Sequence, residues 1–157
     1  MTYSIEDILM YEEGYREKPY YCSEGYPTIG IGTRLGPKGA PLSNYEISFS
    51  KDIAKAFLKE EINKIKNRLS GYPWFKICNE ARRNVLISMA YQMGVNGLLS
   101  FKNTLALIAN KQFEQAANNM LLSKWAKQTP NRAQRHATVM FTGTTDVYKE
   151  LIDGQSS

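Results

Sequence analysis

The sequence predicts an α+β protein that is mostly helical and carries one small sheet near its N-terminus. Three observations lead to this class. Residues 15–32 are rich in aromatic and β-branched side chains and are interrupted by Ser23-Glu24-Gly25, which is typical of a β-hairpin. Residues 51–69 have the pattern of a long amphipathic helix. After that helix, apolar residues recur at helical spacing through the rest of the chain.

The first element is expected to be a helix over residues 3–13. Ser4 opens an S/T-x-x-D/E start signal. Gly14 is suited to end the helix because glycine readily adopts the left-handed conformation found after helix C-termini. Glu12 and Glu13 then lie in the last turn, where the partial negative charge of the helix end disfavours carboxylates. Two acids at this place predict a buried basic partner or a catalytic task.

The hairpin is followed by a turn-rich loop, a possible short third strand at 45–49 and the long helix at 51–69. Ser50 can cap this helix. Its length would let it bridge a β-containing lobe of about residues 13–60 and a helical lobe of about 61–157 that includes the first helix. Its apolar face is expected to consist of Ile53, Phe57, Ile62, Ile65 and Leu69.

The second half of the chain is expected to be helical throughout. The apolar stripe at 80–93 predicts a central core helix, which Gly94 ends. Thr129-Pro130 is a strong start signal, because proline suits the first helical position. Further helices are expected to start near Ser100, to contain Phe113 and Leu121, and to contain Val147 and Leu151. The tail at 153–157 should be frayed.

The net charge is +5, with acidic and basic residues interspersed, which favours a solvated mixed surface with weak attraction to a polyanion. Nucleic acid and bacterial cell wall both qualify, but no nucleic-acid-binding signature is present. The sequence has no apolar run of membrane-spanning length and no secretory signal, so we expect folding in a cytoplasm. Cys22 and Cys78 are expected as free thiols.

Few kinds of chemistry fit these residues. No cysteine and histidine spacing suggests a metal site, and no phosphate-binding or dinucleotide motif predicts a cofactor. The single histidine, His136, is expected to be structural or solvated. Chemistry must therefore rest on carboxylates, hydroxyls or the thiol. Glu13 is the best candidate acid, because a cleft would open where the first helix meets the hairpin.

Four blocks of sequence together resemble the T-even bacteriophage lysozymes, in the same order and over nearly the whole chain. They are Glu13-Gly14 with Glu24-Gly25-Tyr26-Pro27-Thr28-Ile29-Gly30-Ile31-Gly32, Arg82-Arg83 with Met89-Ala90-Tyr91-Gln92-Met93-Gly94, Trp125-Ala126-Lys127-Gln128-Thr129-Pro130-Asn131-Arg132-Ala133, and Thr142-Gly143-Thr144 before Tyr148. The resemblance implies a two-lobed lysozyme fold in which the helix at 51–69 joins the lobes. It also implies hydrolysis of the β-1,4 bond between N-acetylmuramic acid and N-acetylglucosamine in peptidoglycan.

The resemblance further implies a role for each site residue. Glu13 would be the general acid, Thr28 would help to hold the attacking water, and Arg132 would pair with Glu13. Three polar residues would face the sugar chain, namely Gln92, Asn119 and Gln128. The protein would be a monomeric endolysin without a cofactor, held in the host cytoplasm until a phage-encoded holin releases it to the cell wall.

Two departures from the family pattern stand out. The region between the hairpin and the long helix is shorter, so the upper lobe should be smaller. The family's second carboxylate, nine residues after the acid, aligns with Cys22. A thiolate could activate water, although an unperturbed thiol has a pKa of about 8.5. The alternatives are a catalytically silent peptidoglycan-binding homologue and a lyase that needs only the acid.

Overall fold

The structure is a computed structural model that describes residues 1–156. It divides into two compact units, an N-terminal unit of Leu9–Asn63 and a helical unit of Met1–Ile8 with the chain from Lys64 onward. The helices α1 (Ile5–Glu13) and α2 (Lys51–Leu69) contain the boundaries between the units. Helices predominate and one small antiparallel sheet lies near the N-terminus, which confirms the predicted α+β class.

Helix α1 begins at Ile5, two residues after the predicted start, and ends at Glu13 as predicted. The Ser4 hydroxyl accepts a hydrogen bond from the backbone N–H of Asp7 at 3.1 Å, which satisfies a donor of the first turn. Gly14 has φ +70° and donates its N–H to the Met10 carbonyl at 3.0 Å. Glu13 is therefore the last residue of the helix, directly before the sheet.

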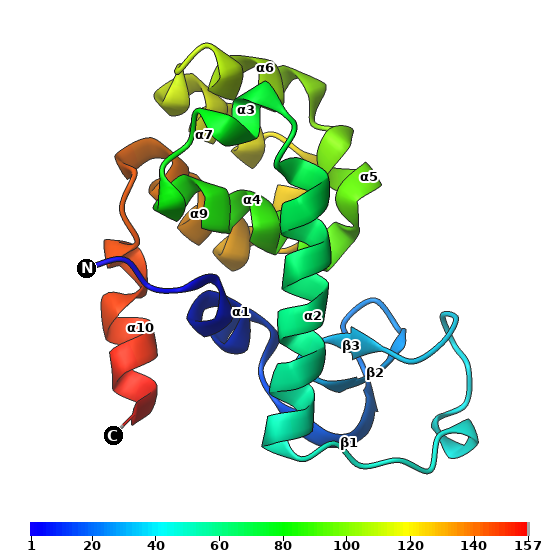
Figure 1. Ribbon diagram of the computed structural model, residues 1–157. Helices are drawn as coiled ribbons and strands as arrows, with labels where there is room; N and C mark the ends of the chain where they lie inside the picture. The colour runs from blue at the N-terminus through cyan, green and yellow to red at the C-terminus, as the bar shows by residue number, and fades with distance from the viewer. Residues whose placement is uncertain (157) are drawn as a thin grey trace. The chain divides into compact units, whose positions relative to one another are not determined.

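The sheet of the N-terminal unit has the order β1-β2-β3, with β1 at Arg16–Tyr21, β2 at Pro27–Gly30 and β3 at Thr33–Arg34 (Figure 1). The hairpin of β1 and β2 confirms the prediction for 15–32. The third strand was predicted at 45–49, and that prediction is wrong. The chain reverses at Ile31-Gly32, where Gly32 has φ +71°, so the strand that follows β2 pairs with it at once. At 45–49 only a single backbone bond reaches β1, from Phe49 N–H to Glu17 O at 2.9 Å.

Helix α2 has the predicted bounds, and Ser50 caps it by accepting from the Ile53 N–H at 3.2 Å. The predicted apolar face is only partly right, because Ile53 and Phe57 are 45% and 47% exposed. The buried stripe instead combines the remaining predicted residues with two others at the same helical spacing, and it consists of Ala54, Leu58, Ile62, Ile65 and Leu69.

The helical unit is built around α4 (Glu80–Met93), as predicted. Residues 84–90 are all buried, and α5 (Val95–Leu99) and α9 (Pro130–Thr142) pack against this helix. Asn79 caps α4 by accepting from the Arg82 N–H at 3.0 Å. The other helices of the unit are α3 (Pro73–Lys76), α6 (Lys102–Ala109), α7 (Phe113–Leu121), α8 (Lys124–Gln128) and α10 (Lys149–Asp153) (Figure 1).

The two ends of the chain meet in the helical unit. The Tyr3 N–H donates to Thr145 Oγ1 at 2.9 Å, and the Tyr3 hydroxyl donates to Asp153 Oδ1 at 2.8 Å. The tail that was expected to fray instead forms a 3₁₀ turn at Gly154–Ser156, and Ser157 lies outside the described residues. Among residues 1–156, no helix is both long and apolar enough to cross a membrane.

Candidate active site

Glu13 stands at the junction of α1 and the sheet, and its side chain is half-buried. Its carboxylate lies against Gly32, because a Cβ atom added at Gly32 would come within 2.7 Å of Glu13 Oε1. The missing side chain at position 32 therefore leaves the room that the carboxylate occupies. The close approach fixes where the acid group sits relative to the end of β2.

Cys22 and Thr28 are held by one backbone oxygen, the carbonyl of Tyr26. This carbonyl accepts the Cys22 N–H at 3.0 Å and the Thr28 hydroxyl at 2.8 Å. Cys22 also opens the turn before β2, since its own carbonyl accepts from the Gly25 N–H at 2.9 Å. The Thr28 proton is directed to a carbonyl, so its oxygen lone pairs can accept a hydrogen bond from another donor. Cys22 is a half-buried free thiol, and Thr28 is buried.

Tyr20 lies among these groups. Its Cα pairs with that of Thr28 across the hairpin, and directly opposed residues of antiparallel strands point to the same face. The pKa of Tyr20 is raised, first by burial and then by the negative charges of Glu13 and, when ionised, Cys22, whereas Arg16 lowers it. Arg16 sits 4.8 Å from the centre of the Tyr20 ring. The phenol therefore stays neutral at physiological pH and can donate a hydrogen bond.

The three predicted sugar-facing residues all belong to the helical unit, and their surroundings differ. Gln92 is half-buried, and its Oε1 accepts from Trp125 Nε1 at 2.8 Å. Asn119 is also half-buried, and its Oδ1 accepts from Thr104 Oγ1 at 2.6 Å. Gln128 ends α8 and is exposed. The contacts fix the amide orientation of the first two, while the third remains open to solvent.

Arg132 lies on α9 and is 6% exposed. Its Nη2 donates to Ser88 Oγ at 2.9 Å and to Ser88 O at 3.3 Å. The Ser88 hydroxyl also contacts His136 Nε2 at 2.7 Å, and His136 Nδ1 contacts the Tyr148 hydroxyl at 3.0 Å. The predicted pairing of Arg132 with Glu13 would join residues of the two units and stays a prediction.

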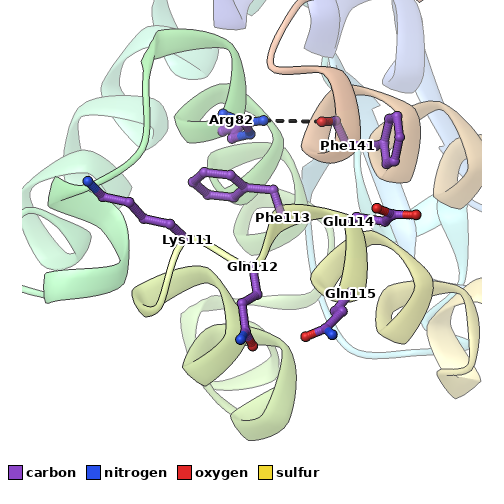
Figure 2. Close-up of a pocket in the computed structure, with 7 residues that line it drawn as sticks. All are labelled: Arg82, Lys111, Gln112, Phe113, Glu114, Gln115 and Phe141. Carbon is purple, nitrogen blue, oxygen red and sulfur yellow. Dashed lines mark hydrogen bonds between the residues drawn. The ribbon is translucent and has the colours of Figure 1, made fainter.

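An open pocket of about 450 Å³ lies at the other end of α9, and Figure 2 shows its lining. Arg82 donates from Nε to Met140 O at 2.8 Å and from Nη2 to Phe141 O at 3.2 Å, and its guanidinium stacks 3.6 Å from the centre of the Phe113 ring. A cation at a helix C-terminus interacts favourably with the carbonyls there. Arg82 therefore anchors the end of α9, and none of the predicted site residues lines this pocket.

Cys78 is a buried free thiol, as the sequence predicts for its free state. It is 4% exposed, its Sγ donates to Trp74 O at 3.3 Å, and burial raises its pKa to about 11. Within residues 1–156, no cluster of three or more His, Cys, Asp or Glu side chains could hold a metal ion. The candidate site residues of the N-terminal unit carry a carboxyl, a hydroxyl, a phenol and a thiol.

Sequence reasoning missed three residues of these assemblies, Tyr20, Ser88 and His136, and simple spacing could have found them. Tyr20 precedes Cys22 by two residues, which places both on one face of an extended strand. His136 follows Arg132 by four residues, and Ser88 precedes Gln92 by four, so each pair shares a helix face. No local signal marks the approach of Glu13 to Gly32, because that contact depends on how α1 packs against the sheet.

The chain is similar to known proteins over most of its length. It matches the phage lysozyme family over residues 10–138. It is 35% identical to "Probable T4-type lysozyme 1" of Dictyostelium discoideum, over 95% of this chain and all of that protein. It is 27% identical to "Pre-baseplate central spike protein Gp5" of Enterobacteria phage T4, over 92% of this chain and 29% of that protein.

A further relative is "Peptidoglycan hydrolase gp36" of Pseudomonas phage phiKMV, 28% identical over 78% of this chain and 13% of that protein. The family match spans both units, and it includes Glu13, Cys22, Thr28 and Arg132. The family match and the α+β architecture together assign the activity class. The chain therefore belongs to the phage lysozyme family and is a glycosidase.

Proposed function

We propose that the protein is an endolysin that hydrolyses the β-1,4 bond between N-acetylmuramic acid and N-acetylglucosamine. Glu13 acts as the general acid, and Cys22 and Thr28 act on the water side of the bond. The observation that carries this proposal is the Tyr26 carbonyl, which accepts hydrogen bonds from both Cys22 and Thr28 on the sheet that follows Glu13. The proposal thus rests on three groups within one small unit.

In the proposed reaction, protonated Glu13 gives its proton to the glycosidic oxygen as the bond from the anomeric carbon to that oxygen breaks. A water molecule donates one hydrogen bond to Thr28 Oγ1 and attacks the anomeric carbon. Cys22, as the thiolate, takes the proton that the water loses. Glu13 ends as a carboxylate and Cys22 as a thiol, and proton exchange with solvent restores both. Attack from the face opposite the leaving group gives an inverted product.

The helical unit supplies the remaining roles in this proposal. Arg132 pairs with Glu13, which offsets the unfavourable position of an acid at a helix C-terminus. Gln92, Asn119 and Gln128 face the glycan. The contact of Gln92 Oε1 with Trp125 supports this role, because it leaves the amide N–H₂ of Gln92 oriented away from that bond.

We also propose that the protein is monomeric and lyses the host cell at the end of phage infection, after a holin releases it from the cytoplasm. Expression in a bacterial host should cause lysis only when the inner membrane is permeabilised. Lysis without any permeabilisation would contradict the dependence on a holin. Light scattering on the purified protein should give the mass of one chain.

The decisive experiment is product analysis on purified peptidoglycan. Wild-type protein should release reducing muramic ends of inverted configuration, and Glu13→Gln should reduce turnover by about 10³-fold while leaving the melting temperature unchanged. An anhydro-muramic product would identify a lyase, and binding without turnover would identify a silent homologue. A Glu13→Gln protein with wild-type turnover would refute the assignment of the acid.

The role of Cys22 has its own test. Cys22→Ser should lower turnover by about 10²-fold, and Cys22→Asp, which restores a carboxylate, should recover it. Alkylation with iodoacetamide should have the effect of the serine variant. This reagent should select Cys22, because Cys78 is buried and its pKa is raised to about 11. Full activity of both the serine variant and the alkylated protein would remove Cys22 from the mechanism.

A further inference from the structure

Four buried side chains of the helical unit form a continuous set of hydrogen bonds that the mechanism above does not use. Arg132 Nη2 donates to Ser88 Oγ at 2.9 Å, Ser88 Oγ meets His136 Nε2 at 2.7 Å, and His136 Nδ1 meets Tyr148 Oη at 3.0 Å. Arg132 is 6% exposed, and the other three are fully buried. Buried hydrogen bonds of this kind hold the groups that they join in one orientation.

One assignment of donor and acceptor roles is consistent with all three bonds. A guanidinium can only donate, so Ser88 Oγ accepts from Arg132. The hydroxyl then has its own proton to give, and His136 Nε2 lies in position to accept it. With Nε2 as acceptor, the imidazole is neutral and carries its proton on Nδ1, which donates to the Tyr148 oxygen. A doubly protonated ring would turn the Ser88 contact around and bring a second positive charge close to Arg132.

Two aromatic rings also pack near the ring of His136. The Trp125 ring lies 5.9 Å away at an interplanar angle of 35°, and the Tyr148 ring lies 6.4 Å away at 50°. Arg132 and His136 are four residues apart on α9, so they share one helix face, and Ser88 meets both from α4. A fixed ring fixes the direction of the Ser88 hydroxyl, which in turn presents its lone pairs to Arg132.

We propose that His136 is a positioning residue for the hydrolytic reaction. As the neutral Nδ1–H tautomer, it orients the Ser88 hydroxyl, and Ser88 holds the Arg132 guanidinium in the orientation that serves Glu13. This inference rests on the proposed function, in which Arg132 is the partner of the acid. It assigns a reaction role to a histidine that touches neither substrate nor reacting atoms.

Two amide variants test the two ring nitrogens of His136 one at a time. In His136→Gln the side-chain amide reaches the place of Nε2, so its oxygen can accept the Ser88 proton. In His136→Asn the amide reaches only the place of Nδ1, so the contact with Ser88 is lost while a polar group still faces Tyr148. Both variants bury an amide in place of the ring, which makes them matched controls for stability.

The first readout is nitrogen-15 NMR of the Arg132 side chain and of the His136 ring in the wild-type protein. The ring should show the neutral Nδ1–H tautomer, and the Arg132 guanidinium should show hindered rotation that persists in His136→Gln and is lost in His136→Asn. The second readout is steady-state turnover of solubilised glycan strands. His136→Asn should lower kcat about 10-fold with little change in KM, and His136→Gln should recover most of the loss.

Ser88→Ala should lower kcat as much as His136→Asn does. The double variant should have the same kcat as either single variant, because both changes break the same hydrogen bond. An Nε2–H tautomer, or equal Arg132 rotation in the Gln and Asn variants, would overturn the proposal whatever the activities are. A loss of Arg132 order with unchanged kcat would overturn the positioning role and would count against Arg132 as the partner of the acid. Failure of the proposed function itself shows separately, as full turnover by Glu13→Gln.

Discussion

The N-terminal unit and the helical unit hold their polar groups in opposite ways. Among the described residues, seven polar or charged side chains are buried, and only Thr28 of these lies in the N-terminal unit. In contrast, five of the seven glycines with positive φ lie in that unit. Backbone turns thus shape the N-terminal unit around its candidate site residues, whereas hydrogen bonds between buried side chains orient the polar groups of the helical unit.

This difference fits the proposed roles, in which the N-terminal unit supplies the proton-transferring groups and the helical unit supplies the supporting residues. Glu13 and Cys22 are half-buried, as groups that exchange protons with substrate and water must be. Ser88, His136 and Arg132 are buried, where low polarity strengthens hydrogen bonds and lets them hold one orientation. We therefore expect activity to be most sensitive to backbone geometry in the N-terminal unit, and stability to be most sensitive to side-chain contacts in the helical unit.

The largest effect should come from Gly32→Ala, with Gly14→Ala as its matched control. Both glycines have nearly the same φ, +71° and +70°, so both substitutions carry the same backbone strain. Only at Gly32 would the new Cβ meet Glu13 Oε1, at 2.7 Å, since nothing lies within 4 Å of a Cβ at Gly14. Displacing the acid should lower peptidoglycan turnover about 10²-fold in Gly32→Ala alone. Equal turnover in the two variants would contradict the claim that Gly32 makes room for the Glu13 carboxylate.

The next effect is a loss of stability at alkaline pH, which belongs to the helical unit. The pKa of Cys78 is raised from its ordinary 9.0 to about 11, so between these values the unfolded chain releases the thiol proton and the folded chain keeps it. The stabilisation is complete below pH 9 and disappears as pH rises through 11, at a cost of about 2 to 3 kcal/mol. Urea unfolding of wild type and Cys78→Ala across this range should show the difference, and parallel pH profiles would contradict it.

Arg82→Met should have a similar or slightly smaller effect at neutral pH. The change removes two charge-assisted bonds to the C-terminus of α9 and the stacking on Phe113, and should lower the free energy of unfolding by about 2 kcal/mol. Thermal unfolding measures the loss. Arg34→Met serves as the comparison in the N-terminal unit, because Arg34 stacks 3.5 Å from the centre of the Tyr26 ring but is exposed. A larger loss from Arg34→Met would reverse the expected contrast.

The smallest predicted effect is the difference in stability loss between two helix-cap variants. Ser50→Ala removes one bond to the Ile53 N–H, whereas Asn79→Ala removes the cap of α4 and also the bond from Asn79 Nδ2 to Gly143 O at 2.9 Å. We expect about 1 kcal/mol for Ser50→Ala and a few tenths more for Asn79→Ala. Chemical denaturation with the two variants side by side can resolve the difference, and a clearly costlier Ser50→Ala would contradict the expectation.

Much of the fold could be predicted from local sequence signals. The Ser4 cap, Gly14, the Ser23-Glu24-Gly25 turn and the full extent of α2 follow from interactions that span a few residues. The predicted third strand at 45–49 was wrong. The chain reverses at Gly32, and the strand directly after this turn pairs with β2 instead. The apolar face of α2 was wrong at Ile53 and Phe57, since packing chose Ala54 and Leu58 instead.

The candidate site divides in the same way. The sequence by itself determined the fold class, the phage lysozyme resemblance and the identity of Glu13, Cys22 and Thr28 as candidates, because motif spacing is a property of neighbouring residues. Only the tertiary structure decided that the Tyr26 carbonyl joins Cys22 to Thr28, that Glu13 lies against Gly32, and that His136 reaches Ser88 across 48 residues of sequence. Such contacts arise when buried surfaces pack together, and packing depends on side chains that are distant in the chain.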